Sequence, residues 1–319
     1  RFAVGNVAEW AAAGTDVAHD HEGGRAVAEA FAEVGAQRLF ADRTQAAFTQ
    51  DLLDLLDPGT AWRLGADPCR LAYDLGGRFD LHRDPAHLAE LLERHAADPR
   101  PKFILTESVF SMDGDIAPIP EIATLAREHG AMLVVDDAHA TGILGEGGRG
   151  LSEGADLVIG TFSKALGSFG AYVACSETMR DYLVNRCGAL IYSTALPPQV
   201  LGAIDAALDL LPTLNAERKR VAELSAHFRR EAQRLGYDTA GSSTQIVPVV
   251  AGSADAALRL SEALREAGFW ATAIRPPTVP QGTSRVRCVF TAAHAPQDLD
   301  SLLEALSASA RRLADAASH

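Results

Sequence analysis

An acid, a histidine and a lysine follow two neighbouring apolar runs of the chain. The first run, residues 132–135, ends directly in Asp136, and His139 comes three residues later. The second run, residues 156–160, is followed by a polar turn that contains Lys164. Short apolar runs bounded by polar residues are typical of buried strands in a parallel sheet. Chemistry in open α/β sheets lies at the carboxyl ends of the strands, so we expect these side chains at one sheet edge.

Lys164 is one of only three lysines in a chain with 29 basic residues. Arginine cannot replace an amine that has to lose its proton, whereas a partly buried lysine shifts its pKa readily. A carboxylate at one strand end and an amine at the next suit a cofactor bound as a Schiff base, with the carboxylate facing a protonated ring nitrogen. An ordinary ion pair at a sheet edge explains the same spacing equally well.

Bulk properties exclude several classes of protein. A length of 319 residues accommodates one large domain and a smaller one. The net charge of −13 argues against a nucleic acid or an anionic membrane as partner, and no apolar run approaches the roughly 20 residues of a membrane span. The four cysteines lack the spacing of a zinc site or a disulfide framework, which favours a reducing cytoplasm and no metal. The chain begins with Arg1 rather than Met, which leaves open whether the natural chain extends upstream.

Local patterns predict strands that alternate with helices, which is typical of a doubly wound α/β sheet. The predicted helices are 85–98, 120–129, 177–186, 199–211, 216–235, one that begins after Ser253 and ends at Gly268, and a terminal helix from about 296. Further strands are predicted at 102–106, 171–175, 246–250 and 286–290.

Five segments resemble the α-oxoamine synthases, which are pyridoxal 5'-phosphate (PLP) enzymes. The segments are TESVFSMDGDIAPIPEI (106–122), VVDDAHATGILGEGGRG (134–150), TFSKALGSFGAYV (161–173), IYSTALPP (191–198) and AIRPPTVPQGTSRVR (273–287). The resemblance implies the aspartate aminotransferase fold (fold type I), with a large, mostly parallel doubly wound sheet domain over residues 1–197. The N-terminal part of this domain looks incomplete. A smaller C-terminal α/β domain is expected over residues 198–319.

The same resemblance assigns the residues around the cofactor. It implies that Lys164 forms the Schiff base with PLP and later moves the Cα proton of the substrate. Asp136 would pair with the pyridinium nitrogen, His139 and Ser111 would contact the ring hydroxyl, and Thr161 would contact the phosphate. A duller alternative is that Thr161 only satisfies backbone groups at a strand end.

Further roles follow from the other matched positions. Thr194 would reach the phosphate of the neighbouring subunit's cofactor, which implies a homodimer with shared active sites. Arg285 would hold the carboxylate of the amino acid, a bidentate task suited to a guanidinium group, although it could also be a surface cation. Glu107 matches an acidic position near the acyl-condensation centre. Asp137 is expected to be structural and to bind nearby backbone amides.

The implied reaction is a decarboxylative condensation of an alanine-like amino acid with an acyl thioester to give an α-amino ketone. The acyl carrier, CoA or a carrier protein, and the acyl length stay open.

The N-terminal third departs from the family pattern and keeps a second function open. Asp42 and Arg43 stand where the family has a Ser-Gly pair in its phosphate-binding turn, and Pro68 or Cys69 stands where a histidine stacks on the ring. These changes would suit a non-catalytic or cofactor-impaired subunit of the same fold.

Two other rivals are disfavoured by their context. GEGGRG (145–150) fits G-x-G-x-x-G, but it neither follows a strand directly nor has the required acid about 20 residues on. No G-x-S-x-G elbow of a serine hydrolase occurs.

Overall fold

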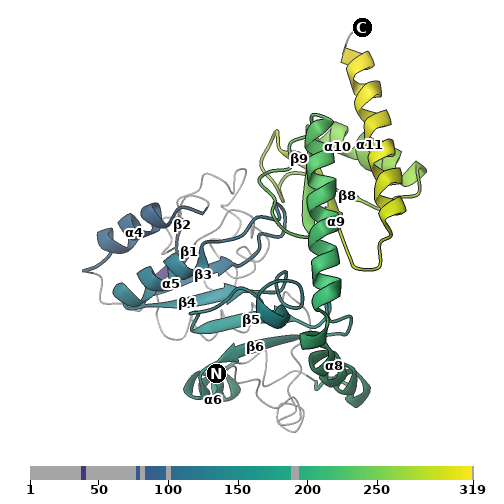
Figure 1. Ribbon diagram of the computed structural model, residues 1–319. Helices are drawn as coiled ribbons and strands as arrows, with labels where there is room; N and C mark the ends of the chain where they lie inside the picture. The colour runs from purple at the N-terminus through teal and green to yellow at the C-terminus, as the bar shows by residue number, and fades with distance from the viewer. Residues whose placement is uncertain (1–36, 41–76, 80–82, 98–101, 188–193, 318–319) are drawn as a thin grey trace. The chain divides into compact units, whose positions relative to one another are not determined.

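A computed structural model of the protein describes residues 37–40, 77–79, 83–97, 102–187 and 194–317, which are coloured in Figure 1. Contacts divide the chain into two compact units. The first includes Arg70–Ser108 and Ala117–Leu214, and the second includes Val109–Ile116 and Asn215–His319. The segments around Asp42 and Cys69, which depart from the family pattern, lie outside the described residues.

The first unit is built on a six-stranded sheet in the order β2-β1-β3-β4-β5-β6. The strands are β1 (Gln37–Phe40), β2 (Gly77–Phe79), β3 (Lys102–Glu107), β4 (Ala131–Asp136), β5 (Leu157–Thr161) and β6 (Ala171–Cys175). All neighbours pair in parallel except β5 and β6, which are antiparallel. Strands β3, β4 and β5 are almost wholly buried, which explains why their sequences are continuous apolar runs.

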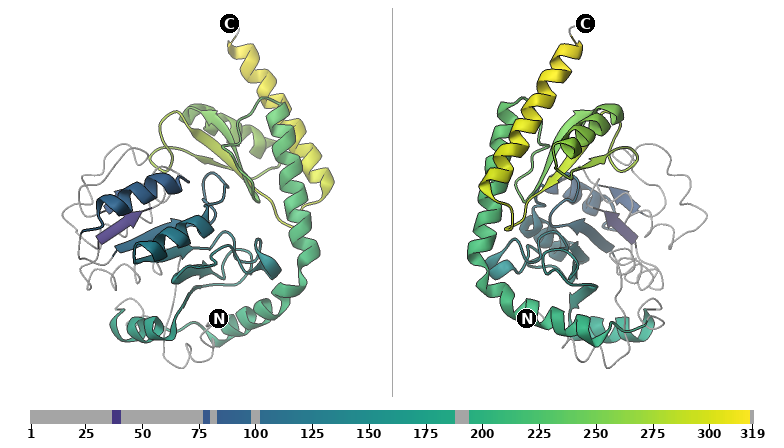
Figure 2. Two further views of the ribbon diagram at one scale, coloured as in Figure 1. Left: turned by 60° about the vertical axis from the view of Figure 1, so that its left-hand side comes forward. Right: turned by 90° about the vertical axis from the view of Figure 1, so that its right-hand side faces the viewer.

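Helices α4 (Pro85–Arg94) and α5 (Ile119–Glu128) pack against each other, and α5 packs against β4 (Figure 1 and Figure 2). The carboxylate of Asp84 caps α4 by accepting hydrogen bonds from two backbone N–H groups of its first turn. The helix ends at Arg94, four residues before the predicted end, ahead of prolines at 99 and 101 that cannot continue it.

The rest of the first unit consists of α6 (Glu177–Arg186), α8 (Pro198–Leu210) and two short 3-10 turns, η2 (Glu146–Gly148) and η3 (Leu211–Thr213). The hydroxyl of Ser176 caps α6 as predicted. The composition shift at Pro197 and Pro198 coincides with the start of α8, whereas the border between the units lies between Leu214 and Asn215.

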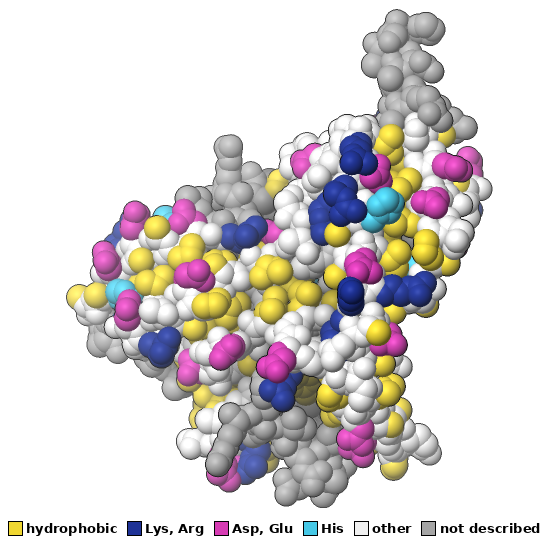
Figure 3. Space-filling model, in the orientation of Figure 1, with side chains coloured by type: hydrophobic (Ala, Val, Ile, Leu, Met, Phe, Trp, Pro, Cys, Tyr) yellow, Lys and Arg dark blue, Asp and Glu magenta, His cyan; other side chains and the backbone are white. Residues whose placement is uncertain are grey.

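On the face of the molecule shown in Figure 3, acidic and basic side chains are interspersed, and neither sign forms a large patch there. No helix in the described part of the chain is long and apolar enough to cross a bilayer.

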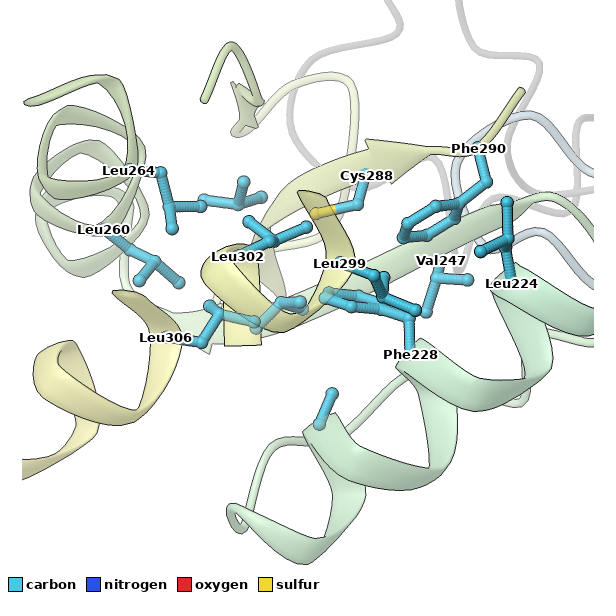
Figure 4. Close-up of a cluster of buried hydrophobic side chains, with 13 residues drawn as sticks. Leu224, Phe228, Val247, Leu260, Leu264, Cys288, Phe290, Leu299, Leu302 and Leu306 are labelled. Carbon is cyan, nitrogen blue, oxygen red and sulfur yellow. The ribbon is translucent and has the colours of Figure 1, made fainter. Parts of the chain in front are cut away.

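The second unit packs three helices around a small antiparallel sheet in the order β7-β9-β8. Its elements are α9 (Asn215–Arg234), β7 (Ile246–Gly252), α10 (Ala254–Glu266), β8 (Thr272–Ile274), β9 (Ser284–Val289) and α11 (Pro296–Ala317). Figure 4 shows the core, where the fully buried ring of Phe228 lies 4.9 Å from that of Phe290. Cys288 packs in this core, where burial raises the pKa of its thiol to about 12.

Several strands differ from the sequence prediction. Strands β1, β2 and β8 were not predicted, β7 ends at Gly252 rather than at 250, and β9 begins at Ser284, two residues before the predicted start. Three residues are too few to show an alternating pattern, and β8 is held by its pairing with β9 rather than by its own sequence.

Candidate active site

The carboxyl ends of three neighbouring strands form one edge of the sheet in the first unit. Glu107, the last residue of β3, is in register with Asp136, the last residue of β4, and Asp136 is in register with Ile159 of β5. His139 and Lys164 each follow three residues after their strand. The register therefore confirms the predicted common edge, while the roles of these residues remain predictions.

Asp136, His139 and Lys164 are half-buried. The residues next to Asp136 and His139 in the chain are buried, namely Asp137, Ala138 and Ala140. The backbone N–H of Ala138 donates a 2.9 Å hydrogen bond to the Asp136 carboxylate, which fixes that side chain at the start of the turn. A carboxylate, an imidazole and an amine thus remain reachable at the edge of a packed sheet.

The turn that carries Lys164 is closed by short-range hydrogen bonds. The N–H of Phe162 donates to the carbonyl of Gly170 and the N–H of Gly167 to that of Lys164. Thr161 is 1% exposed, and its hydroxyl donates to the Gly170 carbonyl at 3.0 Å and contacts the Ser163 hydroxyl at 2.6 Å. These bonds agree with the duller alternative for Thr161, and its contact with a phosphate stays a prediction.

Asp137 is buried beside the reachable acid. Its carboxylate accepts hydrogen bonds from the Ser108 hydroxyl, from the N–H of Leu151 at 3.1 Å and from the Ser152 hydroxyl at 3.5 Å. Burial raises the pKa of this carboxyl to about 6, and the bond from Ser108 opposes part of that rise. The predicted binding of a backbone amide is confirmed.

Tyr172 is a half-buried polar residue that the sequence did not reveal. Its hydroxyl lies 2.8 Å from that of Thr141 in the turn after β4, and burial raises its pKa to about 12. The ring crosses Gly160, where a Cβ would lie 2.2 Å from a ring carbon. A glycine in the middle of an apolar strand was the available signal, because it marks a close approach of another group.

Ser111 and Arg285 belong to the second unit. Arg285 is 4% exposed, so the alternative of a surface cation is wrong. Its Nη1 forms an ion pair with the Asp113 carboxylate and lies 3.4 Å from the Met112 carbonyl, and its Nε donates to the Thr283 carbonyl at 2.9 Å. Ser111 directly precedes the segment that Arg285 binds.

Arg287 lies two residues further along β9, so its side chain extends from the same face as that of Arg285. It is half-buried, and sequence reasoning overlooked it. The alternation in TSRVR was the signal, because it places both arginines opposite the face that buries Val286 and Cys288. The predicted binding of a substrate carboxylate by Arg285 stays a prediction.

Thr194 is exposed and precedes α8 in the first unit. Its predicted contact with the cofactor of a neighbouring subunit also stays a prediction.

The residues at the sheet edge fit the ring and aldehyde end of PLP. Asp136 offers a carboxylate for a protonated ring nitrogen, Lys164 an amine for an aldehyde, and His139 a hydrogen-bonding imidazole, and all three are reachable. These three groups lie at or just after the ends of β4 and β5, the two strands for which the sequence predicted them.

Comparison with known proteins agrees with this geometry. The family described as aminotransferase class I and II matches residues 73–306. An 8-amino-7-oxononanoate synthase of Gluconacetobacter diazotrophicus is 56% identical over 233 residues, which cover 72% of this chain and 58% of that relative. One of Geobacter metallireducens is 49% identical over 241 residues, with coverages of 73% and 61%. The chain spans about three fifths of the length of these curated relatives.

Solved structures are similar over nearly the whole chain. A high-resolution structure of serine palmitoyltransferase with PLP has a TM-score of 0.81 at 25% identity, and the match covers 94% of this chain and 72% of that one. An 8-amino-7-oxononanoate synthase of Francisella tularensis has a TM-score of 0.74 at 22% identity, with coverages of 96% and 86%, which shows the shared fold.

These findings confirm the predicted fold type I, the PLP cofactor and the resemblance to α-oxoamine synthases. That Asp136, His139 and Lys164 face this cofactor stays a prediction. The chain therefore belongs to the aminotransferase class I and II family of PLP-dependent enzymes.

Proposed function

We propose that the protein is an acyltransferase that condenses an alanine-like amino acid with an acyl thioester and releases CO2, the free thiol of the acyl carrier and an α-amino ketone. The observation that carries this proposal is the placement of Asp136 and Lys164 at adjacent strand ends. The names of the curated relatives, 8-amino-7-oxononanoate synthases, support the reaction class.

Each residue of the sheet edge has a distinct task. PLP, when bound, supplies an electron sink for the negative charge that develops at the Cα atom of the amino acid. The Asp136 carboxylate would hold a proton on the ring nitrogen, and His139 would orient the ring through a hydrogen bond. Lys164 would hold the aldehyde end through Nζ, and the same amine, once free, would take up the Cα proton. Glu107 is proposed to act near the incoming acyl group.

The carboxylate of the amino acid is proposed to bind an arginine of β9. The sequence predicted Arg285 for this role, but its guanidinium group forms an ion pair with Asp113. Arg287 lies two residues further along β9, and its side chain extends from the same face. Comparing the variants Arg285→Lys and Arg287→Lys identifies the arginine that binds the carboxylate. Only the variant that changes this arginine should raise the KM for the amino acid while its uptake of PLP stays close to that of the wild type.

Covalent attachment of PLP to Lys164 is the central test. We expect a visible absorption band when the purified chain is mixed with PLP, bleaching with borohydride, and a mass increment on the peptide that contains Lys164. Lys164→Ala should abolish the increment. Lys219→Ala, which removes an exposed lysine of α9, serves as the matched control and should keep it. A reducible adduct in Lys164→Ala would refute the assignment.

The second candidate is a cofactor-impaired subunit of the same fold, which the departures at Asp42 and Pro68 favour. A folded wild-type chain that shows no band at saturating PLP would establish it. If the band forms, amino acids that perturb it identify the first substrate. Acyl-CoA and acyl carrier protein, added in turn, identify the thioester.

A homodimer with shared active sites is proposed from the match of Thr194. Thr194→Ala should weaken PLP binding. A mixed dimer of Thr194→Ala and Lys164→Ala subunits should regain one intact site.

A further inference from the structure

We propose that Asp137 is a positioning residue, whose buried carboxylate fixes the turn carrying Asp136 and His139 against the loop of residues 145–152. The inference rests on the proposed function in one respect, because it treats Asp136 and His139 as the residues that face PLP. Asp137 itself touches neither cofactor nor substrate in this account and acts through its neighbours.

The side chain of Asp137 joins three segments that are far apart in the sequence. The Ser108 hydroxyl reaches it from the end of β3, and the N–H of Leu151 and the hydroxyl of Ser152 reach it from the loop that follows η2. The N–H of Ser108 also donates to the carbonyl of Asp136 at 2.8 Å. Because three separate segments meet at one 0% exposed carboxylate, its removal frees all of them together.

The backbone of Asp137 holds the same turn from the other side. Its N–H donates to the carbonyl of Ile159 in β5 at 2.7 Å, and its carbonyl accepts from the N–H groups of Ala140 and Thr141 and from the Thr141 hydroxyl. His139 therefore lies in a turn closed by Asp137, and Asp136 lies in the residue before it. The hydrogen bonds of the Asp137 carboxylate fix the position of this turn at the sheet edge.

The loop of residues 145–152 is shaped around the carboxylate. Gly150 has φ +88°, and a Cβ at this position would lie 1.5 Å from Oδ2 of Asp137. A Cβ on Gly145 would in turn lie 2.0 Å from the carbonyl oxygen of Gly150. GEGGRG, which matches a dinucleotide fingerprint only by its letters, thus supplies the glycines that let the chain close over Asp137.

A plain packing role would need no charge at this position. A buried carboxylate carries a desolvation cost that an alanine or a leucine would avoid. Asparagine can accept the bonds from Ser108 and Leu151 and can donate to Ser152, so it keeps the geometry without the charge. The structure therefore assigns the function of Asp137 to its hydrogen-bonding shape, which makes conservative rescue the decisive comparison.

The experiment uses the full chain with and without PLP and compares Asp137→Ala, Asp137→Asn and Asp156→Ala. Asp156 is the matched control, because its carboxylate also binds a backbone amide of β4, that of Leu133 at 2.8 Å, but near the opposite end of that strand. Without PLP, amide exchange at 140–151 should rise about tenfold or more in Asp137→Ala only. The Kd for PLP should rise about tenfold or more in that variant, since an unsatisfied buried donor costs about 1.4 kcal/mol or more.

Asp137→Asn should stay within about threefold of the wild type in both readouts. Asp156→Ala should lower the stability of the fold without changing either readout at 140–151 or the PLP spectrum. If Asp137→Ala does not fold, Ser108→Ala takes its place, because it removes only one hydrogen-bond donor to the carboxylate. This variant should raise amide exchange at 140–151 and the Kd for PLP, each by less than is expected for Asp137→Ala.

The inference is overturned if a folded Asp137→Ala variant keeps the exchange pattern and PLP affinity of the wild type. Equal losses of PLP affinity in Asp137→Ala and Asp156→Ala would also overturn it, because stability alone would then explain both. If the wild type takes up no PLP, the proposed function fails. The exchange readout then still shows whether Asp137 holds the turn.

Discussion

Replacing Asp137 by asparagine should change how the stability of the fold depends on pH. The carboxyl group is 0% exposed, and burial raises its pKa from 3.8 to about 6. A group whose pKa is higher in the folded state binds protons more tightly there than in the unfolded chain. Folding is therefore favoured while the group is protonated, and this contribution is lost as the pH rises through about 6.

The size of the effect follows from the two pKa values. The shift from 3.8 to about 6 is roughly two units, and each unit corresponds to about 1.4 kcal/mol. The ionised Asp137 should therefore make the folded state about 3 kcal/mol less stable at pH 8 than the protonated group does near pH 3, below the pKa of 3.8 in the unfolded chain. Asparagine has no such transition, so the free energy of unfolding of Asp137→Asn should lack this part of the pH dependence.

Chemical denaturation of both proteins at several pH values between about 3 and 8 measures this difference. Subtracting the wild-type free energy of unfolding from that of Asp137→Asn at each pH cancels all other titrating groups. The difference should grow in favour of asparagine by about 3 kcal/mol across the range, with its midpoint between 4 and 6. A flat difference would refute the raised pKa. A difference that falls with pH would show that the hydrogen bonds outweigh burial.

Two further predictions concern the second unit, with free energies of unfolding from denaturation as the measurement. Gly114 has φ +69°, and a Cβ there would lie 2.0 Å from the Ile246 carbonyl oxygen, whereas Gly241 has φ +71° and open space. Gly241→Ala should cost roughly 1 to 2 kcal/mol for a left-handed alanine, and Gly114→Ala a further 1 to 3 kcal/mol or so for the clash. Equal costs would show that the backbone yields at Gly114. Phe228→Ala should cost about 3 to 5 kcal/mol, because it empties a fully buried site beside Phe290. A cost below about 1 kcal/mol would mean that the core collapses into the space.

The sequence predicted the elements whose boundaries are marked by local chemistry. Residues 132–135 before Asp136 and 157–160 before Thr161 have no charge and are followed by polar residues, and both became buried strands that end there. Ser176 and Ser253 cap the helices that they were predicted to cap. Such features depend on a few neighbouring residues, so one chain is enough to recognise them.

Features that depend on distant partners were not predictable in the same way. Strand β8 exists through its pairing with β9, and the ion pair of Arg285 joins residues 172 positions apart. Tyr172 reaches the turn after β4 because Gly160 leaves room in a neighbouring strand. In each case the partner is chosen by the three-dimensional fold. Gly160 marked a close approach within its strand, but it did not say which group approaches.

The motif TESVFSMDGD illustrates the consequence for testing the site. Glu107 ends β3 in the first unit, whereas Val109–Ile116, with Ser111, belongs to the second. The carbonyl of Gly114 accepts hydrogen bonds from the backbone N–H groups of Ser243 and Thr244.

Arg285 binds the same segment through Asp113, immediately before Gly114. An Arg285 variant therefore disturbs the segment that carries Ser111 whether or not Arg285 ever binds a substrate carboxylate. Loss of activity in that variant alone does not identify the carboxylate-binding residue. A raised KM for the amino acid with an unchanged Kd for PLP would identify it, whereas a change in both would point to the segment around Ser111.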